Sequence, residues 1–216
     1  MKTLFLVSGL FFTTLLYGQE FKIIKWEDLT VKLDYYDPFK ELTSSQLFNL
    51  SEVAIYRVME ETQELSRSER LRKDSLEQHL KTEKIDIDYL LSMRYKVAES
   101  RNKELQAVNS SLNNKKVVIG GYLLPLNYIE EKVFEFLLVP WVGACIHTPP
   151  PPRNQLIYLK TLEGVEVKSK FQAVKVEGTL TIEDRTSSLY LVDGSSDINS
   201  GYNILDGKVM DLNLMR

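Results

Sequence analysis

Residues 117–139 read VVIGGYLLPLNYIEEKVFEFLLV. This stretch is rich in β-branched and aromatic residues and is interrupted by Gly, Pro and Asn, a pattern typical of strands joined by turns. The runs that we expect to form strands are 117–126, 133–139, 155–160, 172–181, 188–192 and 201–211. Five or six strands in about 100 residues predict a small antiparallel β-barrel, OB-like, or alternatively a sandwich.

The chain before this β-rich part has a helical pattern, so the sequence predicts an α+β protein with N-terminal helices packed on the small sheet. We expect a signal peptide over residues 1–18, a mostly helical region over 19–110 and a β-rich domain over 111–216.

Three helical segments are expected in the helical region. The polar cluster Thr43-Ser44-Ser45 precedes a helix with one wide buried face, formed by Leu47, Leu50, Ala54 and Val58 and flanked by Phe48, Ile55 and Met59. Residues 60–84 are mostly charged and predict a solvated helix or helical linker. Asp86 is expected to cap a third helix, with Ile87, Leu91, Ala98 and Leu105 facing inward.

Two arginines, Arg94 and Arg101, fall on or beside the inward stripe of the third helix. A guanidinium group in that position needs a partner, because burying an unpaired charge is costly. Salt bridges to Asp34 or Asp37 are one explanation, and binding of a ligand is the other.

Composition excludes several classes of function. The chain has 216 residues and a net charge of −3, from 27 basic and 30 acidic side chains without a block of like charge. The charge distribution therefore does not support binding to nucleic acid, or binding to a membrane through a polybasic patch. A single cysteine and two histidines exclude an intrachain disulfide framework and a zinc-finger-type site.

The N-terminus predicts export. Lys2, an apolar run from Leu4 to Leu16 and the small residue Gly18 are typical of a secretory signal, with cleavage expected before Gln19. A membrane anchor is the alternative, but the run is shorter than the roughly 20 residues of a transmembrane helix. We expect a mature chain in the periplasm or outside the cell, without a transmembrane segment.

The loop after residue 139 holds the candidate metal ligands. Cys145 and His147 are two positions apart, so in extended backbone their side chains project to the same side, and Pro149–Pro152 stiffen the loop. Thiolate and imidazole together suit zinc or copper(I). Glu135, Asn154 or Gln155 would have to complete the ligand set.

Two other readings of this pair stay open. Cys145 can be a small buried side chain, with His147 a core histidine bonded to a carbonyl oxygen. A thiol enzyme would use the same two residues as nucleophile and base, but no orienting residue or oxyanion site is identifiable.

The sequence also resembles an uncharacterised bacterial family of exported proteins. The segments that carry the resemblance are GYLLPL at 121–126, EFLLVP at 135–140 and GACIHTPPPPRNQ at 143–155. Looser matches include Trp26–Leu29, Asp37–Phe39, Arg94, Arg101 and 176–180, so the resemblance covers most of the mature chain. Tyr122, in the first segment, therefore joins Glu135, Asn154, Gln155 and the two arginines as a candidate binding residue.

The resemblance implies no established activity. Some members are encoded beside ABC-type transport components and in zinc-limitation gene clusters, which favours the metal hypothesis. The expected function is that of a periplasmic binding or accessory protein, related to zinc or copper and acting with an envelope ABC-type transport system. The alternatives are a metal-free structural interaction module of the envelope and a thiol enzyme; a non-catalytic role is favoured.

Overall fold

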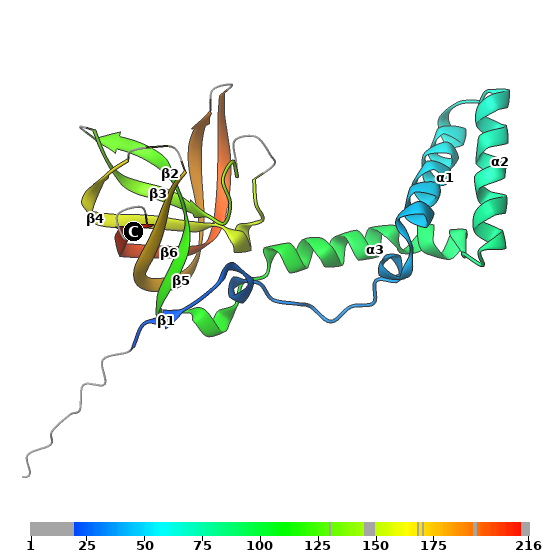
Figure 1. The fold of residues 1–216 in the computed structure, drawn as a ribbon. Coiled ribbons are helices and arrows are strands. Elements are labelled where there is room, and N and C mark those ends of the chain that lie inside the picture. The colour runs from blue at the N-terminus through cyan, green and yellow to red at the C-terminus, as the bar shows by residue number, and fades with distance from the viewer. Residues whose placement is uncertain are drawn as a thin grey trace, which may run out of the picture.

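The computed structural model describes residues 20–129, 131–144, 150–167, 169, 171–191 and 194–212. Figure 1 shows two parts: a closed β-sheet, here called the β-domain, and three helices that extend away from it, here called the helical arm. Helices combined with a six-stranded mixed sheet confirm the α+β class. The expected signal segment, Met1–Gly18, lies outside the described residues.

The elements follow one another with short connections. The helical arm contains the 3-10 helix η2 (Pro38–Glu41) and the helices α1 (Ser44–Thr62), α2 (Arg67–Thr82) and α3 (Ile87–Gln106). The β-domain contains β1 (Lys22–Ile23), η1 (Trp26–Leu29), η3 (Ser110–Leu112), β2 (Lys115–Ile129), β3 (Lys132–Val139), η4 (Arg153–Gln155), β4 (Ile157–Glu166), β5 (Gln172–Leu191) and β6 (Gly194–Asp211).

The five longer strands pair in a ring. Their order is β2-β3-β4-β6-β5, and β2 also pairs with β5, while β1 adds to β2 at the edge. The expectation of a purely antiparallel sheet was wrong, because β1–β2 and β4–β6 pair in parallel. Parallel neighbours need a crossover connection, and the intervening β5 provides it for β4 and β6.

Two of the expected strands are a single one. The run 172–181 and the described part of 188–192 both fall in β5, which pairs with β6 from Val174–Asp211 to Leu191–Gly194. Register shifts at Glu177/Thr179 and Ile182/Arg185 interrupt this ladder. Such irregularities bend a strand and increase its twist. One long β5–β6 hairpin can therefore pair within the ring at one end and extend past the ring at its turn.

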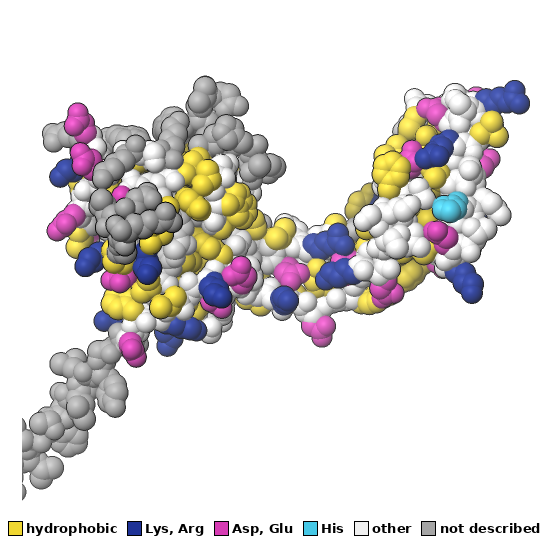
Figure 2. All heavy atoms as spheres, in the orientation of Figure 1, with side chains coloured by type: hydrophobic (Ala, Val, Ile, Leu, Met, Phe, Trp, Pro, Cys, Tyr) yellow, Lys and Arg dark blue, Asp and Glu magenta, His cyan; other side chains and the backbone are white. Residues whose placement is uncertain are grey.

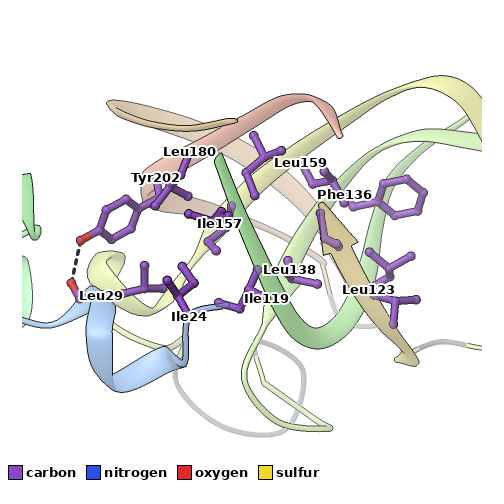
Figure 3. Close-up of a cluster of buried hydrophobic side chains, with 14 of the residues drawn as sticks. Ile24, Leu29, Ile119, Leu123, Phe136, Leu138, Ile157, Leu159, Leu180 and Tyr202 are labelled. Carbon is purple, nitrogen blue, oxygen red and sulfur yellow. Dashed lines mark hydrogen bonds between the residues drawn. The ribbon is translucent and has the colours of Figure 1, made fainter. Parts of the chain in front are cut away.

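The main hydrophobic core lies inside the ring (Figure 3). It is built from alternate positions of the strands, among them Ile119, Leu123, Phe136, Leu138, Ile157, Leu159, Leu180 and Tyr202. Ile24 and Leu29 belong to the same cluster, although they lie about 90 residues or more before most of its other members in the sequence. The N-terminal segment thus contributes two side chains to the core of the β-domain.

A smaller cluster covers the opposite face of β2 and β3. The distal part of the β5–β6 hairpin contributes Leu189 and Ile198, which join Leu124, Leu137, Val139, Ala144 and Leu156. This face is therefore buried at one end by the hairpin rather than by a helix.

Side-chain caps begin the three helices. Thr43 and Gln46 form a capping box at α1, Ser66 and Glu69 form another at α2, and Asp86 accepts a hydrogen bond from the Tyr89 backbone N–H at α3. The expected cap at Asp86 is confirmed. Ion pairs Arg57–Glu77, Arg72–Glu52 and Lys73–Glu60 join α1 to α2.

The expected buried face of α1 was wrong in part. Leu50 and Val53 are buried against Leu76 and Leu80 of α2 and Ile87 and Leu90 of α3. By contrast, Leu47 and Val58 are 39% and 45% exposed. The helix has more apolar surface than its neighbours α2 and α3 cover.

The inward stripe of α3 also differs from the expectation. Ile87 is buried, but Leu90 and Val97 take the places expected for Leu91 and Ala98, and Leu105 is exposed. Within the described part of the chain, no helix is both long and apolar enough to cross a membrane.

Candidate functional site

A groove on the helical arm contains both candidate arginines. Residues from η2, the start of α1 and one side of α3 line a cleft of about 530 Å³: Phe39, Lys40, Leu42, Leu47, Arg94, Val97, Ala98 and Arg101. Apolar side chains and three cations thus share one surface. We call it the arm groove.

Arg101 is held in place by a buried carboxylate. Its Nε and Nη2 atoms lie 2.9 and 2.8 Å from Oδ2 of Asp37, whose side chain is 1% exposed while that of Arg101 is 51% exposed. Asp37 also accepts a hydrogen bond from the Phe39 backbone N–H and so caps η2. The expected salt bridge to Asp37 is confirmed, and it joins η2 to α3.

The other two cations keep their charge uncompensated. The Arg94 guanidinium packs 4.5 Å from the ring centre of Tyr95 and donates to its hydroxyl. Lys40 lies 5.3 Å from the ring centre of Tyr35. Across the described residues, neither side chain has a carboxylate within ion-pair distance. The groove therefore carries net positive charge.

An uncovered apolar face of α1 continues the groove. Because an α-helix turns 3.6 residues per turn, one side of α1 presents Leu47, Phe48, Ser51, Ala54, Ile55, Val58 and Met59, none of them charged. Phe48 and Ile55 are 61% and 58% exposed, and Leu47 belongs to this face and to the groove. Figure 2 shows hydrophobic side chains along α1 and Lys and Arg side chains along α3.

Asn154 holds the arm to the β-domain, and Gln155 joins η4 to η1 within the β-domain. The buried Asn154 donates from Nδ2 to the carbonyl oxygens of Glu104 and Ala107, both at 3.0 Å, and so satisfies the C-terminal end of α3. Gln155 donates from Nε2 to the Trp26 carbonyl oxygen at 2.9 Å. In this structure both side chains bond to the backbone.

Glu135 belongs to a polar cluster on β3 and β4. Its carboxylate accepts a hydrogen bond from Asn127 at 3.2 Å and lies 3.6 Å from Nζ of Lys160. The buried Tyr158 is beside it, and the hydroxyl of Tyr158 has no hydrogen bond to any described residue. Burial, with the Glu135 carboxylate nearby, raises the pKa of Tyr158 to about 12.

Tyr122 lies on β2, opposite Val139 of β3 and Ala173 of β5. It is partly buried and packs against the smaller hydrophobic cluster. Its surroundings are those of a packing residue at the edge of a core.

The candidate metal ligands Cys145 and His147 lie outside the described residues. Among the residues that are described, no three His, Cys, Asp or Glu side chains gather as metal ligands. The zinc or copper site stays a prediction.

Comparison with known proteins assigns the chain to a family. The family model described as a protein of unknown function, DUF3299, matches residues 26–211. The chain belongs to the DUF3299 family. A crystal structure of a DUF3299 family protein from Pseudomonas aeruginosa PAO1 is 24% identical, with coverage of 89% of this chain and 96% of that chain and a TM-score of 0.47. No curated protein matches the chain.

The expected site residues of this DUF3299 protein fall into separate groups. Arg94 and Arg101 share the arm groove, Asn154 and Gln155 share η4, and Glu135 lies with Lys160 on β3 and β4. Sequence reasoning missed Lys40 and Phe39, although the Asp-Pro-Phe-Lys segment, with a helix-capping aspartate, was visible.

Proposed function

We propose that this DUF3299 protein is an exported accessory protein that binds a partner of the cell envelope through the arm groove. The observation that carries the proposal is the combination of apolar walls with three cations, two of which have no carboxylate partner among the described residues. A helix lying in a groove uses this combination, with apolar anchors for affinity and charge for specificity.

The chemistry of the groove supports an acidic, amphipathic partner segment. Apolar side chains of that segment would cover Leu47 and Ala98, which are exposed in the groove, and its carboxylates would meet Lys40 and Arg94. A second copy of this chain fits less well, because a symmetric dimer places the same patch against itself. Like charges would then face each other across the interface.

The identity of the partner rests on the sequence. The N-terminal signal pattern supports export to the periplasm or beyond, and the family resemblance supports a component of an ABC-type transport system. For the β-domain we propose an OB-like barrel as the scaffold that carries the arm. The closed strand order and the parallel β4–β6 pairing support it.

Site-specific photo-crosslinking in the native envelope tests the proposal. A photoreactive residue replaces Phe48 on α1, and a matched one replaces Leu162 of β4, which is 76% exposed. The expected result is an adduct from position 48 alone, whose cross-linked peptide has acidic residues beside an apolar stripe. Its yield should fall at high salt, because salt screens exposed charges.

Charge reversal then tests the role of the cations. Arg94→Glu removes a guanidinium that hydrogen-bonds to its neighbour Tyr95 and forms no ion pair with a described residue, so the fold should survive. The adduct should be lost in Arg94→Glu and kept in Lys208→Glu, an equal charge change on the exposed surface of β6. Equal adducts from both positions, or an adduct insensitive to Arg94→Glu, would refute the groove as the binding surface.

A further inference from the structure

A second pocket lies where the helical arm meets the β-domain. It has a volume of about 350 Å³, and its lining includes Gln106 at the end of α3, Arg153 of η4, and Asp184, Arg185, Thr186 and Asn199 of the β5–β6 hairpin. Pockets for small molecules start at about 300 Å³. The volume therefore suits a small ligand rather than a polypeptide.

The charges in this pocket do not balance. Arg153 donates from Nη2 to the Asp184 carboxylate, and its buried Nε has no hydrogen bond to any described residue. Gly201 makes room for this side chain, since a Cβ at position 201 would lie 3.2 Å from Nε. Arg185 stacks 3.7 Å from the ring centre of Tyr158, and no described carboxylate pairs with it. One positive charge is left over.

The neutral groups of the pocket add hydrogen-bond donors. Thr186 donates to Oδ1 of Asn199 at 2.8 Å, which leaves the amide nitrogen of Asn199 to donate into the pocket. The Gln106 side chain, also at the lining, supplies a second amide. None of the lining side chains is hydrophobic. A ligand that fits these groups is hydrophilic and negatively charged.

The Asp184 carboxylate indicates the ligand class. It is 75% exposed, and it shows how a carboxylate meets the Arg153 guanidinium from the solvent side. We propose that the pocket binds a small hydrophilic carboxylate, with Arg153 and Arg185 donating to its oxygens. Arginine suits this role because its planar fork matches a carboxylate. This site is separate from the arm groove and does not depend on the proposed partner binding.

Calorimetric titration of the purified protein with succinate, at constant ionic strength, tests the proposal. We expect saturable binding with a dissociation constant of about 1 mM or tighter. Arg185→Gln should weaken binding at least about tenfold, because a charge-assisted hydrogen bond is lost. Asp184→Asn should strengthen it, because a carboxylate that competes for Arg153 is removed.

Matched variants separate a site from a general charge effect. Lys208→Gln and Glu163→Gln make the same charge changes on exposed positions of β6 and β4, and both should leave binding unchanged. Arg185 is exposed, so its variant should fold, with only the small drop in melting temperature expected from losing the stacking on Tyr158. The proposal is overturned if succinate does not saturate, if Arg185→Gln binds like Lys208→Gln, or if inorganic phosphate binds and succinate does not. Weaker binding by Asp184→Asn would also overturn it, because Asp184 would then be a contact rather than a competitor.

Discussion

The Tyr202 hydroxyl donates a 2.6 Å hydrogen bond to the carbonyl oxygen of Leu29, 173 positions earlier in the chain (Figure 3). The same hydroxyl accepts a 2.6 Å hydrogen bond from the Asn109 backbone N–H. One buried side chain thus joins β6 to η1 and to the segment that follows α3. Tyr158, also fully buried, has no such hydrogen bond to the described residues.

This contrast predicts opposite effects of removing the two hydroxyls. Tyr202→Phe leaves the Leu29 carbonyl and the Asn109 N–H unpaired and should lower the free energy of unfolding by about 1–3 kcal/mol. Tyr158→Phe removes a buried, unpaired hydroxyl and keeps the ring on which Arg185 stacks, so stability should be unchanged or slightly higher. Urea denaturation measures both. A larger loss for Tyr158→Phe than for Tyr202→Phe would contradict the hydrogen-bond assignments.

Stability should fall in alkali. Burial raises the pKa of Tyr158 to about 12, whereas an unfolded tyrosine titrates near pH 10. Above about pH 10 the unfolded chain therefore releases its proton while the folded chain keeps it, and the free energy of unfolding falls between about pH 10 and 12. Burial also raises the pKa of Tyr202. Tyr158→Phe should therefore reduce, but not abolish, the fall of the unfolding free energy with pH. Urea denaturation at several pH values between about 10 and 12 measures this fall. An unchanged pH dependence in the variant would refute the role of Tyr158.

Asn154 should be needed for the junction between the arm and the β-domain. Asn154→Ala removes both hydrogen bonds to the carbonyl oxygens at the end of α3 and should cost about 1–3 kcal/mol. Hydrogen exchange should accelerate near residues 104–107. Asn102→Ala, on the exposed surface of α3, is the control and should stay within about 0.5 kcal/mol of the wild type. Equal effects of the two variants would contradict the junction role.

The metal hypothesis can be tested by thermal melting with zinc and with a chelator. If Cys145 and His147 share a metal, zinc should stabilise the wild-type protein, and Cys145→Ser or His147→Ala should each abolish that gain. His79→Ala is the matched control, because His79 lies on α2 beside Glu83. Equal destabilisation of the Cys145 and His147 variants with zinc and with chelator would instead indicate simple packing.

Export predicts a defined mature N-terminus. Mass spectrometry of protein recovered from the native envelope should find Gln19, or pyroglutamate formed from it, as the first residue. An intact Met1 on membrane-embedded protein would favour the anchor instead.

Much of the local structure could be predicted because its signals are local. The cap at Asp86 depends on one side chain and a backbone N–H three residues away. The β-rich runs after residue 115 show in their residue types, and six of them became five strands only because 172–191 continues through two register shifts. In the site, the sequence offered Asp34 or Asp37 as a salt-bridge partner, and the structure shows that Asp37 pairs with Arg101.

The buried face of α1 could not be predicted from the sequence. Apolar residues surround much of this helix, so periodicity could not tell which side meets another helix. The structure places Leu50 and Val53 against α2 and leaves Phe48 and Ile55 exposed. That choice depends on where α2 and α3 pack, which the residues of α1 do not encode.

By itself, the sequence determined the α+β class, the cap of α3 and most of the strands, because these show in residue types and in contacts a few residues apart. Only the tertiary structure decided that Lys40, Arg94 and Arg101 share one groove, and that Arg153 and Arg185 line one pocket with Asp184. The physical reason is sequence separation. These side chains come together through the packing of elements tens of residues apart, and that packing reflects the burial of the whole core.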